Sequence, residues 1–252
     1  MKRFLVILFI FGFTLIGFSQ NANDSLLIKA EQQYNEGLYH EAIMSYDLIL
    51  ETGFESPEIY YNKGNSYFKL NDLPSAILYY EKAKKLKPND EDIRYNLNVA
   101  NSRITDNIET VPDIFLKTWW NNFYNMFSAN GWAKISIGLF ILFLLFSTIY
   151  FLSGIRFIKK LFFIIGVISL FITLFSFALS YQKYHYSVAQ KEAIIFEPTV
   201  TVKSSPNKNS VDLFVIHEGT KIYISDELDS WYEIRIANGS VGWLPKSSTQ
   251  II

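Results

Sequence analysis

The chain has 252 residues, with 23 Lys and Arg, 24 Asp and Glu, three His and no Cys. Half of the residues are hydrophobic and 17% are aromatic, which is high for a soluble protein and predicts membrane segments. The lack of Cys excludes disulfides, a thiolate nucleophile, Cys-ligated zinc and a lipid anchor on an N-terminal Cys. Residues 24–110 contain 9 basic and 15 acidic residues, which argues against a nucleic-acid partner.

Residues 1–19 have the three parts of a secretory signal peptide. Lys2 and Arg3 precede an apolar run that ends at Phe18, and the small residues Gly17 and Ser19 occupy positions −3 and −1 of a candidate cleavage site before Gln20. An uncleaved anchor helix is the alternative. In either case we expect the following residues to leave the cytoplasm.

Residues 24–110 contain an internal repeat. Residues 37–50 and 71–84 align at a spacing of 34, with Ala42 opposite Ala76 and Tyr46 opposite Tyr80. This period, with small and aromatic residues at these offsets, resembles the tetratricopeptide repeat. The resemblance implies two helices per repeat, and a third unit beginning at Glu91 lacks a second helix and is predicted to cap the stack.

The register of this family implies a concave face lined by the first helix of each unit. Asparagines on such a face can hydrogen-bond an extended peptide backbone without demanding a sequence, although packing of the superhelix is the alternative role for these side chains. Glu31 and Asp92 would repel a carboxylate, which argues against capture of a peptide C-terminus. The expected partner-binding residues are Tyr34, Tyr61, Asn62, Asn65, Phe68, Asn96 and Arg103.

Residues 112–131 are predicted to form an amphipathic aromatic helix. Phe115, Trp119, Phe123 and Phe127 recur every four residues and share one face, which is widened by Trp120 and Tyr124. Trp and Tyr favour the headgroup layer of a bilayer. A helix lying on the membrane is therefore one interpretation, and packing against the last repeat is the other.

Two apolar segments, 132–152 and 161–181, each have the length of a membrane-spanning helix. Between them, residues 153–160 contain Arg156, Lys159 and Lys160, which the positive-inside rule assigns to the cytoplasm. Both flanks of the hairpin would then face the periplasm, in agreement with the signal peptide. The predicted location is the inner membrane, with interface residues Trp119, Trp120, Tyr124, Arg156, Lys159 and Lys160.

Residues 190–252 are predicted to form several short β-strands. Asn238-Gly239 predicts a type I′ hairpin turn, and Gly219 suits another turn. So many strands in about sixty residues suggest a small closed barrel. The stretches 201–206, 213–224, 231–236 and 239–245 resemble a bacterial SH3-like domain. That resemblance implies a ligand groove near Trp231 and Trp243, while a place in the core is the alternative for Trp243.

The sequence contains no recognisable catalytic motif. His40, His185 and His217 lack partners at metal-ligand spacing, and neither a nucleophile elbow nor a glycine-rich phosphate loop occurs. We therefore predict a non-enzymatic protein with no catalytic residues, no metal and no cofactor.

The order of these segments resembles the E component of the Bacteroides aerotolerance (Bat) proteins. The fold class is accordingly a multidomain membrane protein with all-α tetratricopeptide repeats, a transmembrane helical hairpin and a C-terminal all-β SH3-like barrel. The resemblance implies a scaffold in an envelope complex tied to stress tolerance. Its partners would be membrane proteins with von Willebrand factor A domains and, indirectly, a MoxR-type AAA+ ATPase. The alternative function is a cell-wall sensor or anchor that binds peptidoglycan through the SH3-like domain.

Overall fold

The computed structural model describes residues 21–106, 108, 114–189 and 191–252. The predicted signal peptide lies outside the described residues. The chain divides into two compact units, one ending at Glu55 and the other running from Ser56 to Ile252.

The first unit contains one helical hairpin, made by α2 (Asn21–Asn35) and α3 (Tyr39–Glu51). Gly37 lies in the turn with φ +80°, a conformation that glycine adopts at little cost. Ala42 and Tyr46 are fully buried. The Ser45 hydroxyl also donates to Gln33 Oε1 at 2.7 Å, which joins the two helices. The first predicted repeat therefore has the expected pair of helices.

The second unit begins with three helices, α4 (Pro57–Lys69), α5 (Leu73–Leu86) and α6 (Glu91–Asn101). Side chains of Ser56, Asp72 and Asp90 cap their N-termini by accepting backbone N–H bonds. Asn71 has φ +61° at the α4–α5 turn, the position that aligns with Gly37 in the first hairpin. The 34-residue period thus corresponds to a repeated backbone conformation.

The crossing of α4 and α5 explains the small and aromatic residues of the repeat. A Cβ added to Gly64 would lie 2.7 Å from ring carbons of Tyr80, so only glycine allows this approach. Ala76 and Tyr80 are almost completely buried, together with Leu97 of α6. These contacts join residues that are close in sequence. They therefore account for the spacing of small and aromatic residues from which the repeat was predicted.

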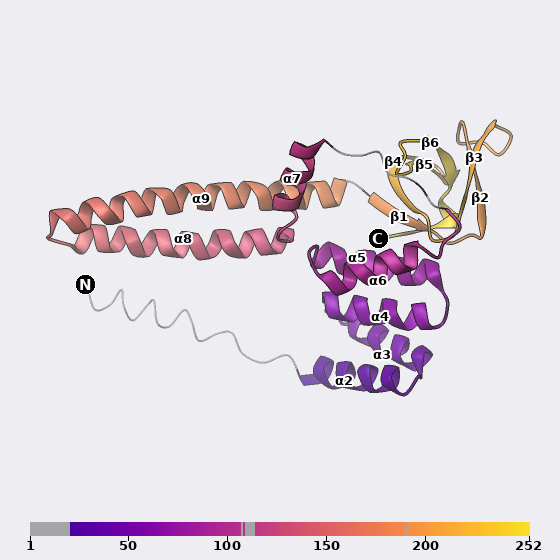
Figure 1. The fold of residues 1–252 in the computed structure, drawn as a ribbon, viewed down its shortest axis with the longest axis horizontal. Helices are drawn as coiled ribbons and strands as arrows, with labels where there is room; N and C mark the ends of the chain where they lie inside the picture. Colours follow the sequence, from indigo (N-terminus) through magenta and orange to yellow (C-terminus); the bar gives the residue numbers. More distant parts are fainter. Residues whose placement is uncertain (1–20, 107, 109–113, 190) are drawn as a thin grey trace. The chain divides into compact units, whose positions relative to one another are not determined.

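Two long helices, α8 (Ala129–Leu152) and α9 (Arg156–Ala189), form an antiparallel hairpin (Figure 1). Ser136 Oγ donates to the carbonyl of Thr173, and Ser169 Oγ donates to that of Leu139. Such bonds from small polar side chains to backbone carbonyls of the neighbouring helix join two largely apolar helices. By length and composition, α8 and the part of α9 up to His185 could cross a membrane.

The bounds of this region differ from those expected. Residues 153–155 alone separate the helices, so Arg156, Lys159 and Lys160 lie in the first turns of α9 and not in a loop. Likewise α9 continues past residue 181 to Ala189, because residues 182–189 contain neither Gly nor Pro to end the helix. The predicted helix at 112–131 is divided into α7 (Phe115–Tyr124) and the start of α8, since Ser128 caps a new helix.

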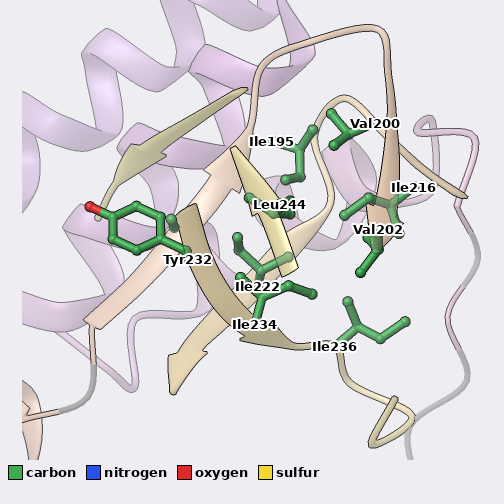
Figure 2. Packing of buried hydrophobic residues seen from close by; sticks show 10 residues of the cluster. Ile195, Val200, Val202, Ile216, Ile222, Tyr232, Ile234, Ile236 and Leu244 are labelled. Carbon is green, nitrogen blue, oxygen red and sulfur yellow. The ribbon is translucent and has the colours of Figure 1, made fainter. Parts of the chain in front are cut away.

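The C-terminal residues 191–252, here called the β-domain, form a seven-stranded antiparallel sheet. Its strands lie in the order β3-β2-β6-β5-β4-β1-β7. Alternate side chains of six strands meet in one apolar core, in which Ile195, Val202, Ile222, Ile234 and Leu244 are fully buried (Figure 2). The strands are β1 (Lys191–Ile195), β2 (Thr199–Lys203), β3 (Asp212–His217), β4 (Lys221–Leu228), β5 (Trp231–Arg235), β6 (Val241–Pro245) and β7 (Thr249–Ile251).

The turn between β5 and β6 corrects the expected type I′ geometry. Gly239 has φ +93°, but Asn238 does not have the positive φ that a type I′ turn requires. Instead Gly239 N–H donates to Ile236 O, and Ser240 N–H donates to the Asn238 side chain. The loop is one residue longer than predicted, with the glycine at the left-handed position after the turn. Gly219, by contrast, occupies the turn that was expected, with φ +83°.

Candidate functional site

Three of the predicted partner-binding residues join in one hydrogen-bonded cluster between α4 and α6. Asn96 Nδ2 donates to Tyr61 Oη at 2.9 Å and to Asn65 Oδ1 at 2.8 Å. Tyr80 Oη, from the buried side of α5, donates to the same Asn65 oxygen at 2.7 Å. The cluster links the polar face to the repeat core, so its side chains are held in place before any partner arrives.

The surroundings of Tyr61 favour the neutral form of its phenol. Burial raises the pKa of the Tyr61 phenol, and the carboxylates of Asp92 and Asp90 act in the same direction. A hydrogen bond from the Asn65 side chain opposes this shift. Tyr61 therefore remains a neutral phenol that can give or accept a hydrogen bond at physiological pH.

The other predicted residues flank the cluster or belong to the first unit. Asn62 is half-buried on α4. The Arg103 guanidinium lies 4.5 Å from the Phe68 ring centroid, a cation–π distance. Tyr34 lies in the first unit, where its ring meets that of Tyr39 edge-on at 5.4 Å.

This arrangement combines amides, a phenol and an arginine that rests on an aromatic ring. Side-chain amides carry both donors and acceptors, as the peptide bond does. The face therefore presents side-chain groups that can both donate and accept hydrogen bonds.

Trp231 and Trp243 lie on the same face of the sheet. Pairing of Trp231 with Pro245, and of Trp243 with Glu233, makes them diagonal neighbours on β5 and β6. Trp231 is 9% exposed and Trp243 is half-buried. Trp243 also pairs with Lys203 of β2, so in the sheet it lies between a basic and an acidic residue on the neighbouring strands. Of the two tryptophans, Trp243 has the accessible surface that a ligand contact needs.

The predicted interface residues occur at the two ends of the helical hairpin. Trp119 and Trp120 are exposed on α7, and Tyr124 is half-buried at its end. At the other end, Lys159 Nζ lies 5.8 Å from the ring centroid of Tyr150. Arg156 and Lys160 are exposed.

Sequence reasoning missed a junction between α5–α6 and the β-domain. Lys221 of β4 contacts Glu81 of α5 at 3.0 Å and Glu192 of β1 at 2.9 Å. Burial alone would raise the pKa of the Glu81 carboxyl, but the ammonium groups of Lys221 and Lys84 lower it overall. Burial would similarly lower the pKa of Lys221, and the two carboxylates raise it. The three side chains therefore form one charged cluster, in which the Lys221 ammonium stabilises the carboxylates of Glu81 and Glu192.

A second polar contact anchors the junction at Asp106. Its carboxylate accepts hydrogen bonds from His217 N–H and from Thr220 Oγ1, each at 2.7 Å, and Oδ1 lies 2.7 Å from His217 Nδ1. Burial would raise the pKa of Asp106, but these hydrogen bonds lower it overall. The segment after α6 is thereby tied to the β3–β4 turn.

The centre of the junction is apolar. Ile194 of β1 is fully buried in a cluster with Ala76, Tyr80 and Leu97, although its neighbour Ile195 belongs to the β-domain core. At Gly219, an added Cβ would lie 2.5 Å from Ile104 Cγ2. A residue of the β-domain thus completes the core of the second repeat.

Little in the sequence marks these residues. Glu81 comes directly after the signature residue Tyr80, where an acid on a buried helix face is unusual. That anomaly points to a buried partner without saying where in the chain it lies. Asp106 and His217 carry no such mark, because Asp106 follows the end of α6 outside any helix or strand and His217 is a half-buried polar residue at the end of β3.

Comparison with known proteins supports part of this picture. Residues 57–90 match the family model of the tetratricopeptide repeat, which covers α4, α5 and the turn that follows. This confirms the prediction for the second repeat and indicates protein–protein interaction, since the tetratricopeptide repeat is a non-catalytic interaction motif. A search of curated proteins found no match to the chain.

Proposed function

We propose that the protein is a non-enzymatic inner-membrane scaffold that binds periplasmic protein partners through its repeats. The observation that carries the proposal is the hydrogen-bonded cluster of Tyr61, Asn65 and Asn96 on a repeat that matches a protein-interaction family. Because Tyr80 anchors the cluster to the core, these side chains lose little conformational entropy when a peptide binds.

The junction supports a common location for the repeats and the β-domain. Glu81 and Asp106 precede the helical hairpin in sequence, while their partners Lys221 and His217 follow it. Residues in contact must lie on the same side of any membrane that α8 and α9 cross. An antiparallel pair of spans satisfies this condition, and the predicted signal peptide favours the periplasm as the common side.

The partners in this proposal are membrane proteins of one envelope complex. By resemblance to the Bat proteins, they carry von Willebrand factor A domains and connect indirectly to a MoxR-type AAA+ ATPase. Coupling to that ATPase would run through the partner membrane proteins, because the proposed topology leaves only the α8–α9 end in the cytoplasm.

The test is affinity capture of the full-length protein from detergent-solubilised membranes. The double variant N62A/R103A alters the polar face outside the Tyr61–Asn65–Asn96 cluster, so we expect the fold to be kept and specific membrane proteins to be lost. Asn98, exposed on α6, provides the matched control N98A, which should retain them. Equal capture by all three proteins would refute the repeat face as the binding surface.

A second candidate function is binding of peptidoglycan by the β-domain, favoured by the accessible ring of Trp243 between Lys203 and Glu233. Co-sedimentation of the full-length protein with purified sacculi tests it. We expect W243A to lose sedimentation if this function is correct, and retention by W243A would argue against it.

A further inference from the structure

Helix α7 exposes a row of large apolar side chains. Phe115, Leu116 and Trp119 are 77%, 73% and 61% exposed, and Trp120 is 41% exposed. These residues share one side of the helix, because positions three and four apart lie on the same face. Such an apolar stripe on a ten-residue helix needs a covering surface.

Phe123, the last residue of the apolar stripe, shows which way this face of α7 points. The Phe123 ring lies 5.6 Å from the ring of Trp132 in α8 and 6.4 Å from that of Phe175 in α9. The exposed residues on the same side of α7 therefore face the layer that the hairpin occupies. The hairpin itself is exposed and apolar there, with Phe171 at 70%. One apolar medium would cover both surfaces.

Lys183 of α9 holds the end of α7 in this position. Its ammonium donates to the carbonyls of Tyr124 at 3.2 Å and Phe127 at 2.9 Å, and to Asn125 Oδ1 at 3.0 Å. Carbonyls at a helix C-terminus lack partners within the helix and carry the negative end of its dipole. A cation from the neighbouring helix satisfies them, and Trp132 Nε1 adds a bond to Tyr124 O at 3.1 Å.

The charges of this region are of one sign. Residues 114–191 contain seven Lys and Arg and no Asp or Glu. Lys134, which is exposed one turn into α8, and Lys117 lie at the same end of the hairpin as α7. Basic residues beside an apolar helix attract anionic lipid headgroups.

We propose that α7 docks on the headgroup layer of an anionic bilayer and that Lys183 is the positioning residue that holds it across the base of the hairpin. The proposal rests on insertion of the hairpin, which is part of the proposed function, but it does not depend on peptide binding by the repeats. It assigns a lipid surface to α7 and a structural role to the ammonium group of the half-buried Lys183.

The experiment uses the full-length protein in lipid nanodiscs with and without an anionic phospholipid. Because the chain has no Cys, single variants L116C, T118C and F140C can each carry one nitroxide label. Position 118 lies on the opposite side of α7 from position 116, and position 140 lies midway along α8. Collision with a water-soluble nickel complex then reports whether each label is immersed.

We expect the label at 140 to be inaccessible, the label at 116 to be protected and the label at 118 to remain accessible. Protection at 116 should diminish without anionic lipid. Equal accessibility at 116 and 118, with 140 immersed, would overturn docking of α7 while leaving insertion intact. An accessible label at 140 would instead refute insertion itself, and equal protection at 116 in both lipids would refute the role of anionic headgroups.

Variants of Lys183 test the positioning role. K183M removes the donor to Tyr124 O at the end of α7 and to Phe127 O beyond it, and we expect loss of protection at 116 with the label at 140 still immersed. K183R keeps the charge and the donors and should restore protection. Unchanged protection in K183M would overturn the role of Lys183.

Discussion

The substitution Ile194→Ala would show whether the β-domain completes the core of the second repeat. Ile194 and Ile195 are adjacent on β1 and both fully buried, but they belong to different apolar clusters. Ile194 contacts the cluster that contains Tyr80 and Leu97, whereas Ile195 contacts the core of the β-domain. The same change at the two positions therefore removes equal volume from two different cores.

The expected cost follows from burial. Truncation of a fully buried Ile to Ala typically lowers the free energy of unfolding by about 2–5 kcal/mol, through lost transfer energy and the cavity left behind. A tenfold change in an equilibrium constant corresponds to about 1.4 kcal/mol, so protection against local opening should fall roughly 30-fold to several thousand-fold. The loss should be largest where the removed side chain packed.

The assay is amide hydrogen exchange on the full-length protein, because exchange reports the stability of each element separately. I194A should increase exchange in α5 and α6, and the matched control I195A should increase it first in β2, β5 and β6. If I194A accelerated exchange only within the strands, as I195A is expected to do, then Ile194 would not belong to the repeat core and the junction would be wrong.

Three further predictions concern the junction. K221M removes the cation that pairs with the buried carboxylate of Glu81 and the half-buried carboxylate of Glu192, and it should lower the free energy of unfolding by about 3 kcal/mol. Adding E81Q should recover part of this loss in a double-mutant cycle, and purely additive effects would contradict the ion cluster. G219A should cost more than the matched control G239A in thermal unfolding, because both glycines have positive φ but only the former meets Ile104; equal costs would show that backbone strain alone acts. The pKa of Asp106 is lowered in the folded state, so its contribution to stability is present above the ordinary Asp pKa of about 4 and is lost as pH falls below it. D106N should therefore flatten the acid side of the stability profile below about pH 4, and an unchanged profile would refute this assignment.

The sequence by itself determined the features that depend on neighbours along the chain. Gly64 and Tyr80 mark the close crossing of α4 and α5, and this is also where the tetratricopeptide family model matches. The two apolar segments predict α8 and α9 because the length and composition of a helix are local properties. Three residues of the polar face, Tyr61, Asn65 and Asn96, were also predicted, since a repeat register places them together.

Only the tertiary structure decided how the parts of the second unit join. Glu81 and Lys221 are 140 residues apart, and Asp106 and His217 are 111 residues apart, with the helical hairpin between them in each case. Helical and strand periodicity relate residues a few positions apart, so they contain no information on such pairs. The same holds for Ile194, whose alternation with Ile195 predicts two buried faces of a strand but not that one of them would lie in the core of a helical repeat.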